Sequence, residues 1–128
     1  MAQSISNQWE LPEFHMNAGE TKMLQLPIYD NYDRLVNAQG MEGRLAFSDY
    51  INRGACLFFV NCTTAFDERC GGHVFVAELQ PSHTIDLCGK YIYQLSAYDP
   101  YDGSRGVLRG VVTVGHNADK AALEEETN

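Results

Sequence analysis

Apolar and polar residues alternate with a period of two along most of this chain, which is the pattern of half-buried β-strands. Within residues 90–98 the odd-numbered positions, such as Tyr93 and Leu95, fall on one face and the even-numbered positions fall on the other. The turn sequence DPYDG follows at 99–103, where proline fixes φ and glycine accepts a positive φ, and alternation resumes over 107–114. This pattern predicts a β-hairpin.

The same alternation recurs along the chain and predicts about seven strands, separated by turns rich in Gly, Asn, Asp and Pro. Only residues 117–127 (NADKAALEEET) have the pattern of a short helix. Short strands at roughly ten-residue spacing indicate an all-β fold, an immunoglobulin-like β-sandwich of about seven antiparallel strands. The predicted strands span 8–16, 20–29, 42–50, 55–63, 72–79, 90–98 and 107–114.

A chain of 128 residues with 45% hydrophobic residues is long enough for one domain with a core and too short for two. We expect an N-terminal arm at 1–13, the sandwich at 14–116 and an acidic C-terminal tail at 117–128. Near the end of the arm, Trp9, Leu11 and Phe14 form a sparse apolar series. We expect Phe14 to pack in the chain's own core, whereas Trp9 fits either that core or a strand added to a neighbouring subunit.

The formal net charge of −8 argues against two classes of partner. Nucleic-acid affinity depends on Lys and Arg neutralising phosphates, and docking on an anionic membrane surface also needs basic residues. No apolar run approaches the roughly 20 residues needed to span a bilayer. The N-terminus has no basic segment followed by an apolar one, so we expect no secretory signal and synthesis in a cytosol.

The four cysteines fit a reducing compartment as free thiols that are buried or half-buried. A structural zinc site normally draws two ligands from one tight C-x2-C knuckle, which this sequence lacks, and Cys70 with His73 is its only close Cys/His pair. We expect no metal and no cofactor, and a thiol- or metal-dependent protein is kept as a weaker alternative. The cysteines are Cys56, Cys62, Cys70 and Cys88.

Catalytic motifs are not recognisable in the sequence. The histidines are scattered over predicted strand ends and loops, no nucleophile sits in a recognisable elbow, and no glycine loop precedes a helix. We therefore expect no catalytic residue and no enzymatic activity. The histidines are His15, His73, His83 and His116.

Two similar turns, YDNYD at 29–33 and YDPYDG at 98–103, combine aspartates with tyrosines. Clustered carboxylates suit Ca²⁺, but neither turn has the alternating acidic spacing of an EF-hand loop. Aromatic and acidic residues at loop tips suit a sugar or a protein partner, and the protein partner is favoured while the relative position of the two turns is unknown. The candidate contact residues are Trp9, Tyr29, Asp30, Tyr32, Asp33, Asp99, Tyr101 and Asp102.

A structural role is expected for Tyr91 rather than a ligand contact. In immunoglobulin-like sandwiches a tyrosine early in the penultimate strand returns its hydroxyl to an upstream backbone group, and Gly89 suits the bend that precedes it. Tyr93 then stands where an antibody domain has its second core cysteine. Trp9 lies far upstream of the third strand, so the antibody Cys/Trp/Cys pattern is absent.

Several stretches taken together resemble a known family. They are the glycine-led GETKMLQLPI at 19–28, the aspartate turn YDNYD, VNAQG at 36–40 leading into GRLAFS at 43–48, and the closing LCGKYIYQL, DPYDG and LRGVVTV. This series is similar to the immunoglobulin-like N-terminal domain of upper baseplate proteins of tailed phages, a module also found in other phage tail and head-fibre proteins. The resemblance spans about residues 14–115, is most specific in the closing segments and is weakest over 50–75.

The resemblance implies a non-enzymatic structural protein of a phage virion, made in the host cytoplasm. Proteins of that family continue into coiled-coil and receptor-facing regions, and this sequence ends after the sandwich, which we expect of a capsid decoration, a head-fibre base or a small tail adaptor. Its partners would be other virion proteins, contacted through the tails and an edge strand and repeated by the symmetry of the particle. The alternative is a small carbohydrate-binding or host-adhesion module that uses the tyrosine and aspartate loops.

Overall fold

The computed structural model describes residues 10–51, 55–101 and 103–116, and these residues form eight β-strands and one short helix. The predicted all-β class is confirmed, whereas the helix expected at 117–127 lies outside the described residues. No helix in the described ranges is long and apolar enough to cross a membrane. In chain order the elements are β1 (Phe14–Asn17), β2 (Lys22–Leu26), β3 (Glu42–Asp49), β4 (Cys56–Asn61), β5 (Thr63–Asp67), β6 (Gly72–Leu79), α1 (Pro81–Thr84), β7 (Gly89–Tyr98) and β8 (Arg105–Gly115).

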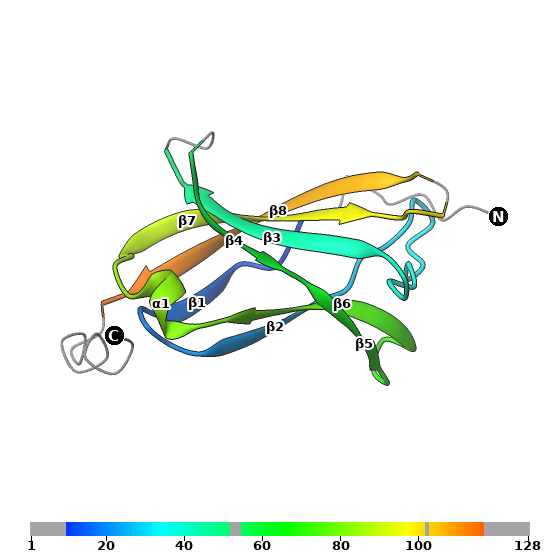
Figure 1. The fold of residues 1–128 in the computed structure, drawn as a ribbon, viewed down its shortest axis with the longest axis horizontal. Helices are drawn as coiled ribbons and strands as arrows, with labels where there is room; N and C mark the ends of the chain where they lie inside the picture. The colour runs from blue at the N-terminus through cyan, green and yellow to red at the C-terminus, as the bar shows by residue number, and fades with distance from the viewer. Residues whose placement is uncertain (1–9, 52–54, 102, 117–128) are drawn as a thin grey trace.

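The strands form two sheets that face each other across the core (Figure 1). The larger sheet has the order β1-β8-β7-β3-β4 and the smaller sheet has the order β2-β6-β5. The predicted hairpin is present, because β7 and β8 pair antiparallel over their whole length, with Leu95 opposite Leu108. The inward-facing side chains of both sheets carry the stability of the fold, at roughly 1.5–3 kcal/mol for each fully buried large apolar side chain. They include Leu26, Leu45, Phe47, Phe75, Leu79, Tyr93, Leu95 and Val112, all at most 3% exposed.

One strand pair departs from the antiparallel arrangement that the sequence predicts. Strand β1 runs parallel to β8, with Phe14 opposite Val112 and Met16 opposite Val114. The expectation of antiparallel strands throughout is therefore wrong for this pair. Hairpin connections enforce antiparallel pairing only between strands that are neighbours in the chain, and β1 and β8 come from its two ends.

The strand count is eight in the described residues rather than about seven, because β5 follows β4, which fills most of the strand predicted at 55–63. Strand β4 pairs with β3 in the larger sheet, the chain changes sheet at Cys62, and β5 pairs with β6 in the smaller sheet. The N–H of Cys62 donates to the carbonyl of Gly43 at 2.9 Å, which keeps the crossing point attached to β3. Residues 56–67 thus supply one edge strand of each sheet.

The first predicted strand, at 8–16, is shorter in the structure and begins at Phe14. Leu11 is nevertheless 7% exposed and donates its N–H to the carbonyl of Arg109 at 3.0 Å. Pro12 has no N–H to donate, so a continuous ladder from residue 11 into β1 cannot form. The segment predicted as an arm therefore supplies a core residue. Phe14 packs against this core as expected, and Trp9 lies outside the described residues.

The segment after β6, which the sequence marks only as a turn at 81–82, is the one-turn helix α1. Its start is fixed by the N–H of Gln80, which donates to Nδ1 of His83 at 2.9 Å. The side chain of Thr84 is fully buried and its Oγ1 accepts the N–H of Gly19 at 3.0 Å, which ties α1 to the turn between β1 and β2.

Candidate functional site

The two aspartate turns lie at the same end of the molecule, where β2 ends, β3 begins and the β7–β8 hairpin turns (Figure 1). The ring of Tyr101 packs against Gly40 so closely that a Cβ on this glycine would come within 3.0 Å of Cε2. Gly40 also has a φ of +81°, a conformation that favours glycine. The loop before β3 and the β7–β8 turn are therefore in direct contact.

Asp30 organises the first turn. Its Oδ1 accepts the N–H groups of Tyr32 and Arg34 at 2.8 and 3.0 Å, and its Oδ2 accepts Nε of Arg34 at 3.2 Å. The N–H of Arg34 in particular, together with that of Tyr32 and the guanidinium charge, lowers the pKa of this carboxyl from its ordinary 3.8 against the opposing effect of burial. Asp33 completes the turn with a φ of 63°.

Asp99 does the same in the second turn. Its Oδ1 accepts the N–H of Tyr101 at 2.9 Å. Its backbone N–H donates to the carbonyl of Ser104, and its carbonyl accepts the N–H of Gly103. Asp99 is 9% exposed, so this carboxylate is enclosed by the turn that it holds together. Asp102 lies outside the described residues.

Each turn thus uses its first aspartate to hold a tyrosine at the tip. Tyr32 is 78% exposed and Tyr101 is 85% exposed, whereas Tyr29 is half-buried and bridges to Leu35. Among the described residues, no three His, Cys, Asp or Glu side chains lie close enough together to hold a metal ion. The end of the sandwich offers exposed rings, and the two carboxylates are engaged within the turns.

Tyr91 makes a local backbone contact at the other end of β7. Its hydroxyl accepts the N–H of Cys88 and donates to the carbonyl of the same residue, both at 3.0 Å. Gly89, between them, has a φ of +109° that a side chain would strain. Tyr93, two residues on, is 1% exposed and donates its hydroxyl to the carbonyl of Pro12, beneath the sheet.

All four cysteines are free thiols. Cys62 and Cys70 are half-buried as expected, but Cys56 and Cys88 are exposed, which corrects the expectation for these two. Cys56 is the first residue of β4 and Cys88 directly precedes β7, so both lie at strand starts, away from the centre of the core. Burial raises the pKa of the Cys62 thiol to about 11, so this group stays protonated at neutral pH.

The described histidines near these cysteines make aromatic contacts. The ring of His83 stacks on Phe58 with centroids 5.0 Å apart, and His73 meets Phe66 edge-on at 5.7 Å. Both histidine side chains therefore pack against phenylalanine rings of the sandwich.

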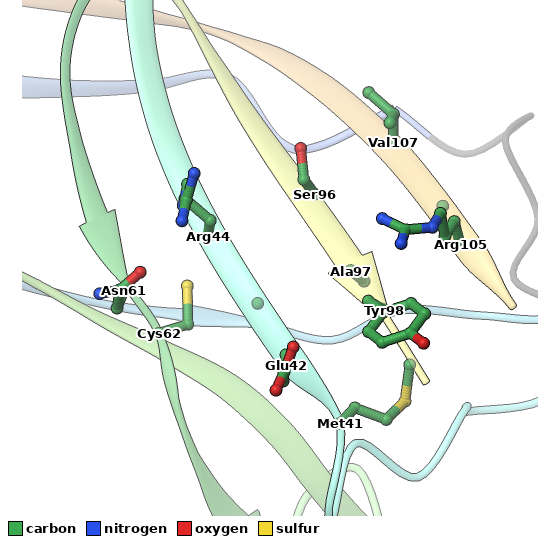
Figure 2. Close-up of a pocket in the computed structure, with 12 residues that line it drawn as sticks. Met41, Glu42, Arg44, Asn61, Cys62, Ser96, Ala97, Tyr98, Arg105 and Val107 are labelled. Carbon is green, nitrogen blue, oxygen red and sulfur yellow. The ribbon is translucent and has the colours of Figure 1, made fainter. Parts of the chain in front are cut away.

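The sequence reasoning missed a shallow depression of about 660 Å³ on the outer side of the larger sheet, over β3, β7 and β8 (Figure 2). Arg44 on β3 and Arg105 on β8 flank the β7 residues Ser96 and Tyr98, and Glu42 lies at the lower edge. The alternation already indicated a basic outer surface, because basic residues occupy outward positions in three of the predicted strands. What the sequence could not supply was the order in which these strands lie side by side.

Comparisons with known proteins add no relative. The chain matches no protein-family model, and a search of curated proteins gave no match.

Proposed function

We propose that the protein is a non-enzymatic structural accessory protein of a tailed-phage virion. It docks on capsid proteins, as a decoration or head-fibre base, or on tail and baseplate proteins. The sequence resemblance indicates that the assembly is a tailed-phage particle. The exposed edge formed by β4 and β5 is the surface that we propose for docking.

This edge carries the proposal. Residues 56–67 form one edge strand of each sheet, and an edge strand leaves unpaired N–H and C=O groups that can pair with another chain. Leu57 is 44% exposed, Phe59 52% and Phe66 59%, so large apolar side chains accompany these backbone groups. Exposed apolar side chains along an open edge favour a protein partner.

We also propose that the sandwich is immunoglobulin-like. Its first strand lies parallel to its last, and the continuous segment 56–67 passes directly from an edge of one sheet to an edge of the other at Cys62. The Tyr91 hydroxyl returns to the backbone of Cys88. These features support the arrangement expected from the resemblance, with Tyr91 as the corner tyrosine.

Cryo-electron microscopy of the phage particle encoded beside this gene tests the proposal. Density for the sandwich at lattice points of the head, or in a ring of the tail, is the expected result, and purified particles that lack the protein contradict it. The variant Leu57→Ser/Phe66→Ser should lower incorporation into particles. Met23→Ser is the control, because Met23 is 58% exposed on β2, the outermost strand at the opposite side of the smaller sheet.

A carbohydrate-binding or adhesion module is a second candidate, favoured by one observation. The two aspartate turns lie at the same end of the molecule, with Tyr32 and Tyr101 both exposed (Figure 1). A glycan array with the isolated protein tests this function. Binding that is lost in Tyr101→Ala and kept in Tyr50→Ala, at the other end of β3, is the expected result, and an array without signal dismisses the candidate.

A further inference from the structure

Charge is distributed unevenly over the described residues. We define the basic face as the outward-facing side chains of β3, β4, β7 and β8, the side opposite the core. The register places four of the seven described Lys and Arg residues on this face and only one of the twelve described Asp and Glu residues, which is Glu42. A protein with a net charge of −8 thus has one face on which positive charge is in excess. The cationic members are Arg44, Lys90, Arg105 and Arg109.

The guanidinium groups that border the depression rest on aromatic rings of the same face. Cζ of Arg44 lies 4.5 Å from the ring centroid of Phe59, and Cζ of Arg105 lies 4.3 Å from that of Tyr98. Stacking of this kind fixes the plane of a guanidinium while leaving its N–H edges directed outward. Within the described ranges, no carboxylate lies within 4.0 Å of any cationic group of the basic face.

Two arginines outside the basic face, Arg34 and Arg69, have a carboxylate partner. Arg34 also stacks on a ring, that of Tyr32 at 5.1 Å, but its Nε lies 3.2 Å from the carboxylate of Asp30. Nε of Arg69 lies 3.7 Å from Oδ1 of Asp67. Arg44 and Arg105 have the ring without a carboxylate partner among the described residues.

We propose that the basic face binds an acidic polypeptide segment of a partner protein, whose carboxylates take the position that Asp30 takes beside Arg34. A guanidinium presents paired N–H groups that match a carboxylate, and the depression between Arg44 and Arg105 admits an extended chain across β7. Nucleic acid fits less well, because phosphate binding needs many cationic groups and the rest of the molecule is strongly acidic.

This inference goes beyond the proposed virion role and does not depend on it. The docking edge shares Phe59 with the basic face, but Arg44 and Arg105 lie on β3 and β8, so the edge can fail as an interface while the basic face still binds acidic peptides. The two ideas are therefore tested by different experiments, one on particles and one on the isolated protein.

The test uses a fluorescently labelled oligoglutamate peptide, with the glutamine version of the peptide as a neutral control. Fluorescence anisotropy should show binding of the glutamate peptide alone, weakening as the ionic strength rises toward about 0.15 M. Arg44→Gln/Arg105→Gln should weaken binding by about tenfold or more. Arg34→Gln/Arg69→Gln changes the net charge by the same amount and should alter affinity by less than about twofold, because these arginines already have carboxylate partners.

A third variant separates position from charge. Tyr98→Leu keeps every cation and removes the ring under Arg105, so we expect a loss of affinity of about two- to fivefold. Equal losses in the two double-arginine variants, no binding by the natural chain, or tighter binding of an oligonucleotide of equal length than of oligoglutamate would each overturn the proposal.

Discussion

The aspartate turns and the basic face use charged side chains in opposite ways. In the turns, the carboxylates of Asp30 and Asp99 accept backbone N–H groups of later residues in the same turn, and Asp30 also pairs with Arg34. On the basic face, Arg44 and Arg105 rest on aromatic rings with no described carboxylate in reach. The charges of the turns stabilise the fold, whereas those of the face leave their hydrogen-bonding edges for another molecule.

This comparison also separates two kinds of candidate site. Because the carboxylates of Asp30 and Asp99 are engaged, a ligand at these turns would meet mainly the exposed tyrosine rings and the exposed residue Asp33. The basic face presents both rings and free donors. The following predictions test whether the division holds, beginning with the side chains that should matter most for stability.

The largest effect should come from beneath the basic face. Tyr93 is 1% exposed, lies 4.9 Å from the ring of Phe14 and bonds the carbonyl of Pro12. Tyr93→Ala should lower the free energy of unfolding by about 3–5 kcal/mol, measured by urea denaturation, because it leaves a cavity and frees the N-terminal segment. Tyr98→Ala, on the opposite side of the same strand, is the control and should cost about 1 kcal/mol. Similar costs for the two variants would show that the face is as structural as the core.

The next effect should appear in the hairpin turn. Asp99→Ala removes the enclosed carboxylate that accepts the Tyr101 N–H and should cost about 1–3 kcal/mol in urea denaturation. Asp99→Asn keeps Oδ1 and should recover most of this loss. If the asparagine variant is as unstable as the alanine variant, the negative charge rather than the hydrogen bond is responsible.

Local alternation allowed the sequence to predict the β7–β8 hairpin and the all-β class, because both depend on neighbours in the chain. It did not reveal β5, whose sequence TTAFD has no buried side chain. Nor did it predict the parallel pairing of β1 with β8, since alternation gives the face of a residue but not the partner of its strand.

The candidate sites follow the same division. The aspartate turns are contiguous in sequence and were found as motifs, although their position at the same end of the molecule depends on the fold (Figure 1). The basic face draws its residues from strands that are separated in sequence and adjacent only through the sheet order. Leu11 was assigned to an arm because its apolar neighbours are sparse, yet the chain still reaches β8 through one hydrogen bond.

Acid should weaken the first aspartate turn. The N–H of Arg34 holds the pKa of Asp30 below 3.8, so the folded state favours the ionised carboxylate. Its contribution to stability is complete above the pKa of the unfolded chain and is lost as the pH falls through the lower pKa of the folded state. Denaturation between about pH 5 and pH 2 should show a smaller loss of stability on acidification for Asp30→Asn than for the natural chain. A titration of the Asp30 carboxyl carbon by NMR with a midpoint at or above 3.8 would contradict this prediction.

The smallest effect on stability should come from the basic face itself. Arg44→Gln and Arg105→Gln should each change the free energy of unfolding by no more than about 1 kcal/mol, the limit set by the loss of one exposed cation–π contact. Arg34→Gln is the informative comparison, because it loses an ion pair with Asp30 as well as the contact with Tyr32. We expect its cost to equal or exceed that of either face variant in urea denaturation. A larger cost on the face would mean that Arg44 and Arg105 serve the fold, and they would then not be reserved for a partner.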